Sequence, residues 1–302
     1  MSQSRTGSAM KIEIDPAAGF CFGVDSVIRE AEARLRAGES LFGLGEMVHN
    51  QAEVERLRKL GLKTIRHSDL SSMAARKVLF RAHGEPPSTY RIAREYGVEV
   101  IDGTCPIVTR LQKRIREVYM GMDPEREQLV IFGKPDHPET IGLVGQVDGN
   151  ALVVSGEADI RKIEPGKKVH LFSQTTMDPD RFSELERAIK NRLGTGAETN
   201  KESFSSECTI CGQMKRRKPS LAAFAQQFDL VLFVSGKNSS NGKMLFEFCL
   251  GINSSTKWIA GPGDVDPAWL EGIGRVGISG ATSTSREQLE AVREQVARIA
   301  AP

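Results

Sequence analysis

The residues with the widest chemical scope in this 302-residue chain are its cysteines and histidines, five of each. Cys21 and Cys105 stand beside glycine or proline in GFCFGV and DGTCPI, each directly after an apolar run, and Cys208 and Cys211 form a CxxC pair. Thiolates hold iron-sulfur clusters and zinc, and three protein ligands with one open position are typical of catalytic metal sites. One thiol from each third of the chain would suit a metal site that three segments share.

The CxxC pair has other interpretations. It also fits half of a zinc site or a redox pair, but the sequence has no second CxxC, and this one follows a polar linker rather than an early strand. Cys249, in KMLFEFCLGIN, lies among apolar residues. We expect it to be a small core residue, because cysteines outside disulfides are among the most buried residue types.

Hydroxyl, amide and imidazole groups gather in clusters that follow apolar runs. Such neutral-to-cationic donors suit a phosphate or diphosphate. The members of this predicted pocket are His49, His83, His137, Ser239, Ser240, Asn241 and Ser283. An ATP-type P-loop does not explain them, because GKNSSNGK is one residue too long and Met244 replaces the magnesium-binding Ser or Thr. No GxGxxG follows a strand-like run, so a dinucleotide site has no support.

Glu139 and the SQTT stretch each allow two interpretations. Glu139 fits a carboxylate in the first turn of a helix, or a proton donor inside a dry pocket. Gln174, Thr175 and Thr176 fit N-capping groups for the next helix, or groups that orient a substrate hydroxyl.

The elements that must position these residues alternate between strand and helix. Seven apolar runs are each followed by a polar or glycine-containing cluster, and stretches with helical spacing lie between them, namely 27–35, 51–60, 109–119, 180–193 and 286–299. This alternation predicts parallel βαβ units, whose ligands bind beyond the carboxyl ends of the strands. We expect an α/β protein with a leader at 1–10, modules at 11–104, 105–206 and 207–302, and a connection at 194–206.

Composition sets limits on partners and location. The formal charge is +2, from 41 basic and 39 acidic residues, which gives no field that would favour nucleic acid. The first ten residues lack the apolar core of a secretory signal, and no later apolar run approaches a membrane span. We therefore expect a cytoplasmic protein without a nucleic-acid or membrane partner.

The ordered motifs GFCFGV, EMVHN, RAHGEPP, DGTCP, HPE, SQTT, TIC, SGKNSSNGK and GATSTS run from about Lys11 to Val292. In this order they resemble the 4-hydroxy-3-methylbut-2-enyl diphosphate reductases of the LytB family. That family catalyses the last step of the non-mevalonate (MEP) route to isoprenoid precursors. The resemblance implies three small α/β modules with mainly parallel sheets, in pseudo-threefold arrangement around a central cluster and substrate cavity.

The resemblance also implies the cofactor and the roles of the residues. Cys21, Cys105 and Cys211 would hold one 4Fe-4S cluster per chain with one iron free of protein ligands. The diphosphate would bind the seven pocket residues, with Glu139 as the acid and Thr175 near the substrate hydroxyl. The products would be isopentenyl and dimethylallyl diphosphate, and reduced ferredoxin or flavodoxin the electron donor. Met214 stands where many members have a threonine.

The same residue types also fit two other classes of protein. A Cys/His zinc hydrolase acting on a phosphorylated substrate, or a cluster-based redox sensor, would also use thiols and histidines. The basic run KRRK, 215–218, is expected to be a solvated face, and the alternative is that an acidic ferredoxin or flavodoxin docks near it, because it adjoins the third predicted ligand. The phenylalanines of GFCFGV, Phe20 and Phe22, are expected to form a dry wall beside Cys21. The alternative is that only one of them faces the thiol and the other belongs to the core.

Overall fold

The computed structural model describes residues 10–194, 203–237 and 239–301. It contains three four-stranded sheets whose strand pairs all run parallel. The chain divides into two compact units, of which the first comprises the residues up to Asp25, Val48–Leu60 and the residues from Arg216 onward. The second comprises Ser26–Met47 and Gly61–Lys215. The prediction of three α/β modules with parallel sheets is confirmed.

The first unit holds one sheet, in the order β1-β12-β10-β11. Its strands are β1 (Lys11–Ile14), β12 (Arg275–Gly280), β10 (Leu230–Val234) and β11 (Thr256–Ile259). Strand β1 pairs with β12, so Lys11–Ile14 belongs to the same sheet as the end of the chain and not to the predicted module 11–104. A division into consecutive segments misses such a strand, because its pairing partner lies more than 260 residues away.

The second unit holds the other two sheets. One has the order β3-β2-β4-β5, from β3 (Lys63–Ile65), β2 (Leu41–Leu44), β4 (Lys77–Phe80) and β5 (Glu99–Asp102). The other has the order β7-β6-β8-β9, from β7 (Leu152–Val154), β6 (Glu127–Phe132), β8 (Lys168–Ser173) and β9 (Phe204–Ser206). Residues 1–9 of the predicted leader and 195–202 of the predicted connection lie outside the described residues, and Phe204–Ser206 of that connection forms a strand.

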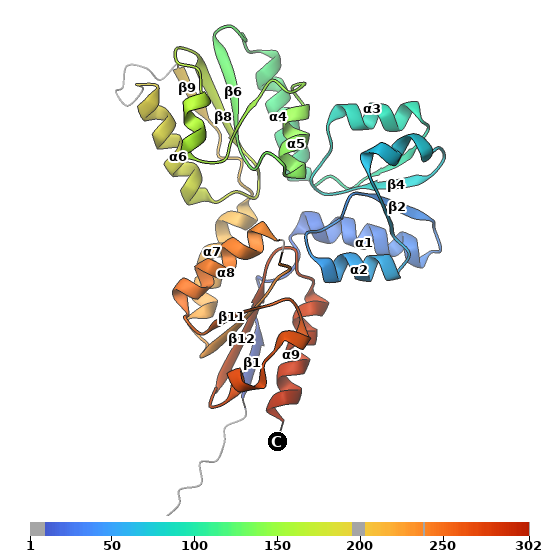
Figure 1. Cartoon of the computed structure of the whole chain (residues 1–302), viewed down its shortest axis with the longest axis vertical. Coiled ribbons are helices and arrows are strands. Elements are labelled where there is room, and N and C mark those ends of the chain that lie inside the picture. The colour runs from blue at the N-terminus through green and yellow to red at the C-terminus, as the bar shows by residue number, and fades with distance from the viewer. Residues whose placement is uncertain (1–9, 195–202, 238, 302) are drawn as a thin grey trace, which may run out of the picture. The chain divides into compact units, whose positions relative to one another are not determined.

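Helices follow most strands (Figure 1), and the five predicted helical stretches all lie within or close to helices. The bounds are α1 Phe22–Arg36, α2 Gln51–Lys59, α3 Pro87–Glu95, α4 Pro106–Met120, α5 Pro138–Gly145, α6 Pro179–Arg192, α7 Gly212–Ala225, α8 Ser240–Ile252 and α9 Arg286–Ala300. Helices α3 to α6 begin with proline, whose fixed φ suits the first helical position and whose missing N–H is not needed there. None of the described helices is both long and apolar enough to cross a membrane.

The cores form where helices cover the sheets. In the β6–β8 sheet, Leu129 and Ile131 of β6 pack with Ile115 of α4 and Leu143 of α5, all at most 2% exposed. On α6, Phe182 packs its ring 6.2 Å from that of Phe132. Alternate residues of one strand therefore anchor helices to the sheet, as the period of two requires.

Strand register decides which polar clusters become neighbours. Phe132 at the end of β6 pairs with Ser173 at the end of β8, Phe80 of β4 pairs with Asp102 of β5, and Val234 of β10 pairs with Gly280 of β12. Each pair of neighbouring strands thus ends at the same level and delivers two polar clusters to one sheet edge. This is where parallel sheets bind ligands.

Candidate functional site

A buried carboxyl group lies at the edge of the β6–β8 sheet. Glu139, in the first turn of α5, is 1% exposed, and Thr175 follows β8 and is 5% exposed. The backbone N–H of Thr175 donates to Glu139 Oε1 at 2.6 Å, and Thr175 Oγ1 donates to Oε2 at 2.8 Å. Burial raises the pKa of Glu139 to about 7, although both hydrogen bonds from Thr175 act to lower it. A carboxyl with such a pKa can hold and release a proton near neutral pH.

The neighbouring Gln174 fixes this pair in place. Its Oε1 accepts hydrogen bonds from the backbone N–H of Lys134 and from Thr140 Oγ1, both at 3.1 Å, and its Nε2 donates to Thr176 Oγ1 at 2.6 Å. These bonds join the loop after β6 to the loop after β8. The alternative in which the SQTT stretch caps the next helix is wrong, because Asp178 accepts the N–H of Asp180 and caps α6.

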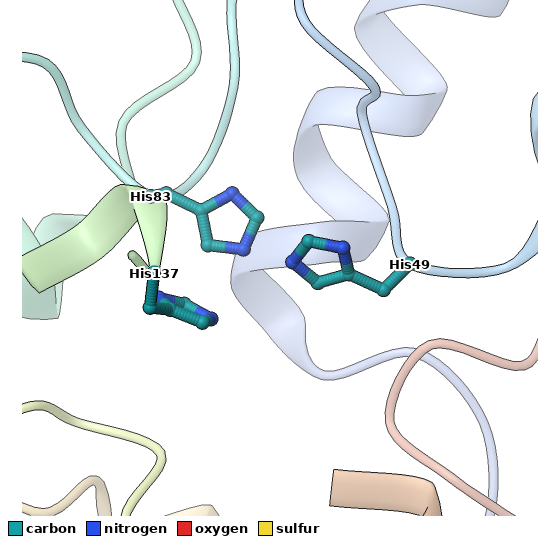
Figure 2. Close-up of side chains that lie close together, drawn as sticks. All are labelled: His49, His83 and His137. Atoms are coloured by element: carbon teal, nitrogen blue, oxygen red, sulfur yellow. The ribbon is translucent and has the colours of Figure 1, made fainter. Parts of the chain in front are cut away.

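Two of the predicted histidines lie together beside this region. His83 follows β4 and His137 precedes α5, and their rings lie close together (Figure 2). The ring centroids are 5.2 Å apart and the ring planes meet at 83°. His137 Nδ1 accepts the backbone N–H of Glu139 at 3.2 Å and thereby caps α5. Because Nδ1 is an acceptor, the proton of a neutral His137 is on Nε2, the nitrogen suited to donate to an anion.

Close backbone packing holds the His83 loop against α5. A Cβ added at Gly142 would lie 3.0 Å from the carbonyl oxygen of Gly84, and one at Gly145 would lie 2.5 Å from Pro86 Cβ. Gly84 has φ +73°, a conformation that side chains disfavour. The RAHGEPP turn therefore depends on glycines both within it and on the helix that it meets.

Each predicted cluster ligand directly precedes a helix. Cys21, Cys105 and Cys211 stand immediately before α1, α4 and α7. The carbonyl of each accepts the N–H four residues later, at 2.9, 2.9 and 3.1 Å. Gln213 N–H also donates to Cys211 Sγ at 3.3 Å. Backbone donors at helix starts stabilise negative charge on sulfur, so this donor set fits an iron-sulfur cluster.

The two cysteines of the CxxC pair differ in setting. Cys211 is half-buried, and its N–H donates to the carbonyl of Thr175 at 2.9 Å, which ties this thiol to the Glu139–Thr175 pair. Cys208 is exposed and precedes no helix. This contrast supports Cys211 as the ligand, which stays a prediction. Cys249 is fully buried in an apolar cluster, as expected for a core residue.

Predicted pocket hydroxyls lie together at the edge of the β10–β12 sheet. Ser239 caps α8 by accepting the N–H of Gly242 at 3.0 Å, and its Oγ lies 3.3 Å from Ser283 Oγ. Asn241 Nδ2 donates to Thr282 Oγ1 at 2.6 Å. Ser240 begins α8, but its side chain lies outside the described part of the structure. A helix N-terminus with hydroxyl and amide groups is suited to bind an anion.

His49 lies beside this cluster of hydroxyl and amide side chains. Asn50, the residue after His49, is a further residue of the cluster that the sequence did not predict. Asn50 caps α2, and its Nδ2 donates to Ser283 O at 3.0 Å and Gln288 Oε1 at 2.8 Å. A Cβ on Gly236 would lie 3.1 Å from His49 O. The capping role was readable from an asparagine before a helical stretch, whereas the long-range bonds were not.

The prediction that the basic run 215–218 is solvated is wrong for Arg217, its third residue. Arg217 is 2% exposed and forms an ion pair with the buried Asp15, with 2.7 Å between Nη1 and Oδ2. Arg217 Nη2 also donates to Ser279 Oγ and Gly280 O. Because Asp15 follows β1 and Ser279 belongs to β12, the arginine joins α7 to two strand ends. Only the fold brings these residues together.

The two phenylalanines beside Cys21 differ in exposure, and the predicted apolar wall does not include Phe22. Phe22 is 69% exposed, because it occupies the first position of α1 while Val27 and Ile28 of that helix turn into the core. Phe20 is half-buried. Phe22 therefore does not shield the thiol in the way that we expected.

Comparison with known proteins agrees with these features. A family model described as "LytB protein" matches residues 12–297. The 4-hydroxy-3-methylbut-2-enyl diphosphate reductase of Bacteroides thetaiotaomicron is 45% identical over 287 residues, which cover 95% of this chain and 98% of that protein. The protein of the same name from Chloroherpeton thalassium is 40% identical over 307 residues, covering 95% of this chain and 96% of its own length.

Solved structures give the same match. The structure of (E)-4-hydroxy-3-methyl-but-2-enyl diphosphate reductase, described as the terminal enzyme of the non-mevalonate pathway, is 29% identical with a TM-score of 0.72. The alignment covers 96% of this chain and 99% of that one. A reductase from Plasmodium falciparum, at 22% identity and a TM-score of 0.79, covers 94% and 86% and supports the fold alone.

Proposed function

Because the chain belongs to the LytB family, we propose that it is a 4-hydroxy-3-methylbut-2-enyl diphosphate reductase. The reaction replaces the allylic hydroxyl of the substrate by hydrogen, with two electrons and two protons consumed and one water released. The products are isopentenyl and dimethylallyl diphosphate. The observation that supports this proposal most strongly is the buried Glu139 carboxyl, whose pKa is about 7 and whose two oxygens both accept hydrogen bonds from Thr175.

We propose that Cys21, Cys105 and Cys211 hold one 4Fe-4S cluster and leave one iron without a protein ligand. Their positions before α1, α4 and α7 support this assignment, since each places a thiol where backbone N–H groups point outward. When bound, such a cluster supplies electrons one at a time and a Lewis-acidic metal.

The diphosphate is bound by donor groups from several loops. The proposed donors are His137, with its proton on Nε2, and His49, His83, Ser239, Ser240, Asn241 and Ser283. Charge-assisted and neutral hydrogen bonds to phosphoryl oxygens fix the substrate, so that its hydroxyl meets the acid in one orientation. The N-terminus of α8 adds the positive end of its dipole.

Glu139 supplies the proton that turns the leaving hydroxyl into water. Its carboxyl holds that proton because desolvation disfavours the ionised form. Thr175 orients the carboxyl and lies between it and the thiol segment, whose Cys211 N–H donates to Thr175 O. The second proton goes to one of two carbons of the allyl system, which accounts for two products.

We further propose that the chain works in the cytoplasm with reduced ferredoxin or flavodoxin as the electron donor. It would need neither nucleic acid nor a membrane, in keeping with a formal charge of +2.

Metal analysis and a turnover assay together test this function. Protein purified without oxygen should be brown and contain about four irons per chain, the content of one 4Fe-4S cluster. It should convert the hydroxymethylbutenyl diphosphate with reduced methyl viologen as the donor. A colourless protein with one zinc would favour the zinc hydrolase, and a brown protein without turnover would favour the redox sensor.

A further inference from the structure

Helix α4 presents a cationic face that the proposed reaction chemistry does not use. Its inner side packs Val108, Leu111 and Ile115 into the core. The outer side exposes Arg110, Lys113, Arg114 and Arg116, with Glu117 the one acid of the helix. The chain as a whole is nearly neutral, so this concentration of positive charge is local.

Most of these charges are available for a partner. Arg110, Lys113 and Arg116 form no ion pair with any residue in the described ranges, and Arg114 pairs with Glu207 at 2.6 Å. Lys113, Arg116, Glu117 and Met120 line a shallow hollow in the surface. Met120 is 76% exposed, which adds an apolar contact among the cations.

The cationic face adjoins two of the three proposed cluster ligands. Cys105 is the N-cap residue of α4 itself. Arg114 of α4 contacts Glu207. Cys208 follows Glu207 in the chain, and its carbonyl accepts a hydrogen bond from Lys215 Nζ at 3.3 Å. Glu207, four residues before Cys211, therefore lies against the exposed side of α4. We call the group of Arg110, Lys113, Arg114, Arg116, Met120 and Lys215 the α4 surface.

A reductase of this kind needs an external source of electrons. The sequence has no GxGxxG motif after a strand, which a bound nicotinamide or flavin dinucleotide would favour. Electrons must then enter from a separate carrier near the thiols. A cationic patch with an exposed apolar residue matches a small acidic protein by charge complementarity, which raises the rate of encounter.

We propose that the α4 surface docks an acidic one-electron carrier protein, which donates electrons to the cluster next to Cys105 and Cys211. This inference rests on the proposed function and moves the docking position away from the full basic run 215–218. Of that run, Arg217 is buried in its ion pair and Lys218 lies over the Phe248 ring at 5.6 Å. Lys215 contacts Cys208, the residue after the Glu207 that pairs with Arg114, and is therefore counted in the α4 surface.

A donor-specific kinetic assay tests the docking surface. The double variant Arg110→Gln/Lys113→Gln should lower kcat/KM for a reduced acidic ferredoxin about tenfold at low ionic strength, because it removes steering charges. The loss should shrink as added salt screens the surface. Turnover with reduced methyl viologen, which needs no protein docking, should stay unchanged.

Arg91→Gln/Arg94→Gln is the matched control, because it removes two exposed positive charges from α3 of the same unit. It should leave kcat/KM for the ferredoxin within about twofold of wild type if the effect is local. An equal loss in both double variants, or no loss in the α4 variant, would overturn the docking surface alone. A cluster-loaded wild type inactive even with methyl viologen would overturn the proposed function instead.

Discussion

Thr175 donates to both carboxylate oxygens of Glu139, through its backbone N–H to Oε1 and through its hydroxyl to Oε2. These two hydrogen bonds favour the ionised carboxylate and lower the pKa of Glu139. Burial disfavours the ionised form more strongly, so the pKa rises to about 7. The pair therefore combines fixed orientation with a proton that is held at neutral pH. A carboxyl that only started a helix would need neither property.

Glu139→Gln should keep the cluster and the affinity for substrate but lose turnover by about 100- to 10,000-fold, the usual contribution of a general acid. Glutamine has nearly the same shape and can still accept one hydrogen bond from Thr175. The measurement is kcat with reduced methyl viologen, together with iron content and substrate affinity.

Glu287→Gln is the control for Glu139→Gln. Glu287 also occupies the second position of a helix, α9, but it is exposed. Its substitution should leave kcat unchanged. Near-normal turnover of Glu139→Gln would remove Glu139 from the mechanism.

The pH dependence of turnover should respond to Thr175. The acid must be protonated to act, so kcat should fall as pH rises through the pKa of Glu139, near 7. The Thr175 hydroxyl stabilises the ionised form and lowers that pKa, so Thr175→Val should raise it and move the falling limb to higher pH. A limb that stays in place, or moves to lower pH, would show that another group controls it.

The two cysteines of the CxxC pair should differ in their effect on iron content. Cys211→Ser should lower the iron content of anaerobically purified protein, because it removes a thiolate from the predicted site. Cys208→Ser should leave it unchanged, since Cys208 is exposed and precedes no helix. The reverse outcome would place the third ligand three residues earlier in the chain.

Two glycines of α8 should respond in opposite ways to alanine. A Cβ on Gly242 would lie 1.9 Å from Ser235 Oγ, so Gly242→Ala should displace the start of α8 and weaken diphosphate binding. Gly251 has nothing within 4 Å of an added Cβ, and Gly251→Ala should stabilise the protein by up to about 1 kcal/mol through helix propensity. Substrate affinity and denaturation midpoints of both variants measure this; equal affinities would contradict the packing argument.

Much of the fold is readable from the sequence because its signals are local. The apolar runs become strands, and five helical stretches and the core position of Cys249 follow from spacing. Short strands such as Lys63–Ile65 and Leu152–Val154 are too brief to show an apolar run. The pairing of β1 with β12 has no local signal at all.

The candidate site also combines features that local sequence shows with features that only the fold creates. Glu139, Thr175 and the three predicted histidines lie in short sequence motifs, so they can be identified as site candidates from the sequence. The contacts of Asn50 with Ser283, and of Arg217 with Asp15, join residues more than 200 positions apart and depend on strand order. Exposure is equally non-local, which explains why the expectations for Arg217 and Phe22 failed.

The most direct test of the central claim is product analysis. Cluster-loaded protein, kept from oxygen and supplied with reduced methyl viologen, is incubated with 4-hydroxy-3-methylbut-2-enyl diphosphate, and the products are separated and identified. We predict isopentenyl and dimethylallyl diphosphate, with two electrons consumed for each molecule formed. Unchanged substrate, or release of phosphate without loss of the allylic hydroxyl, would contradict the account.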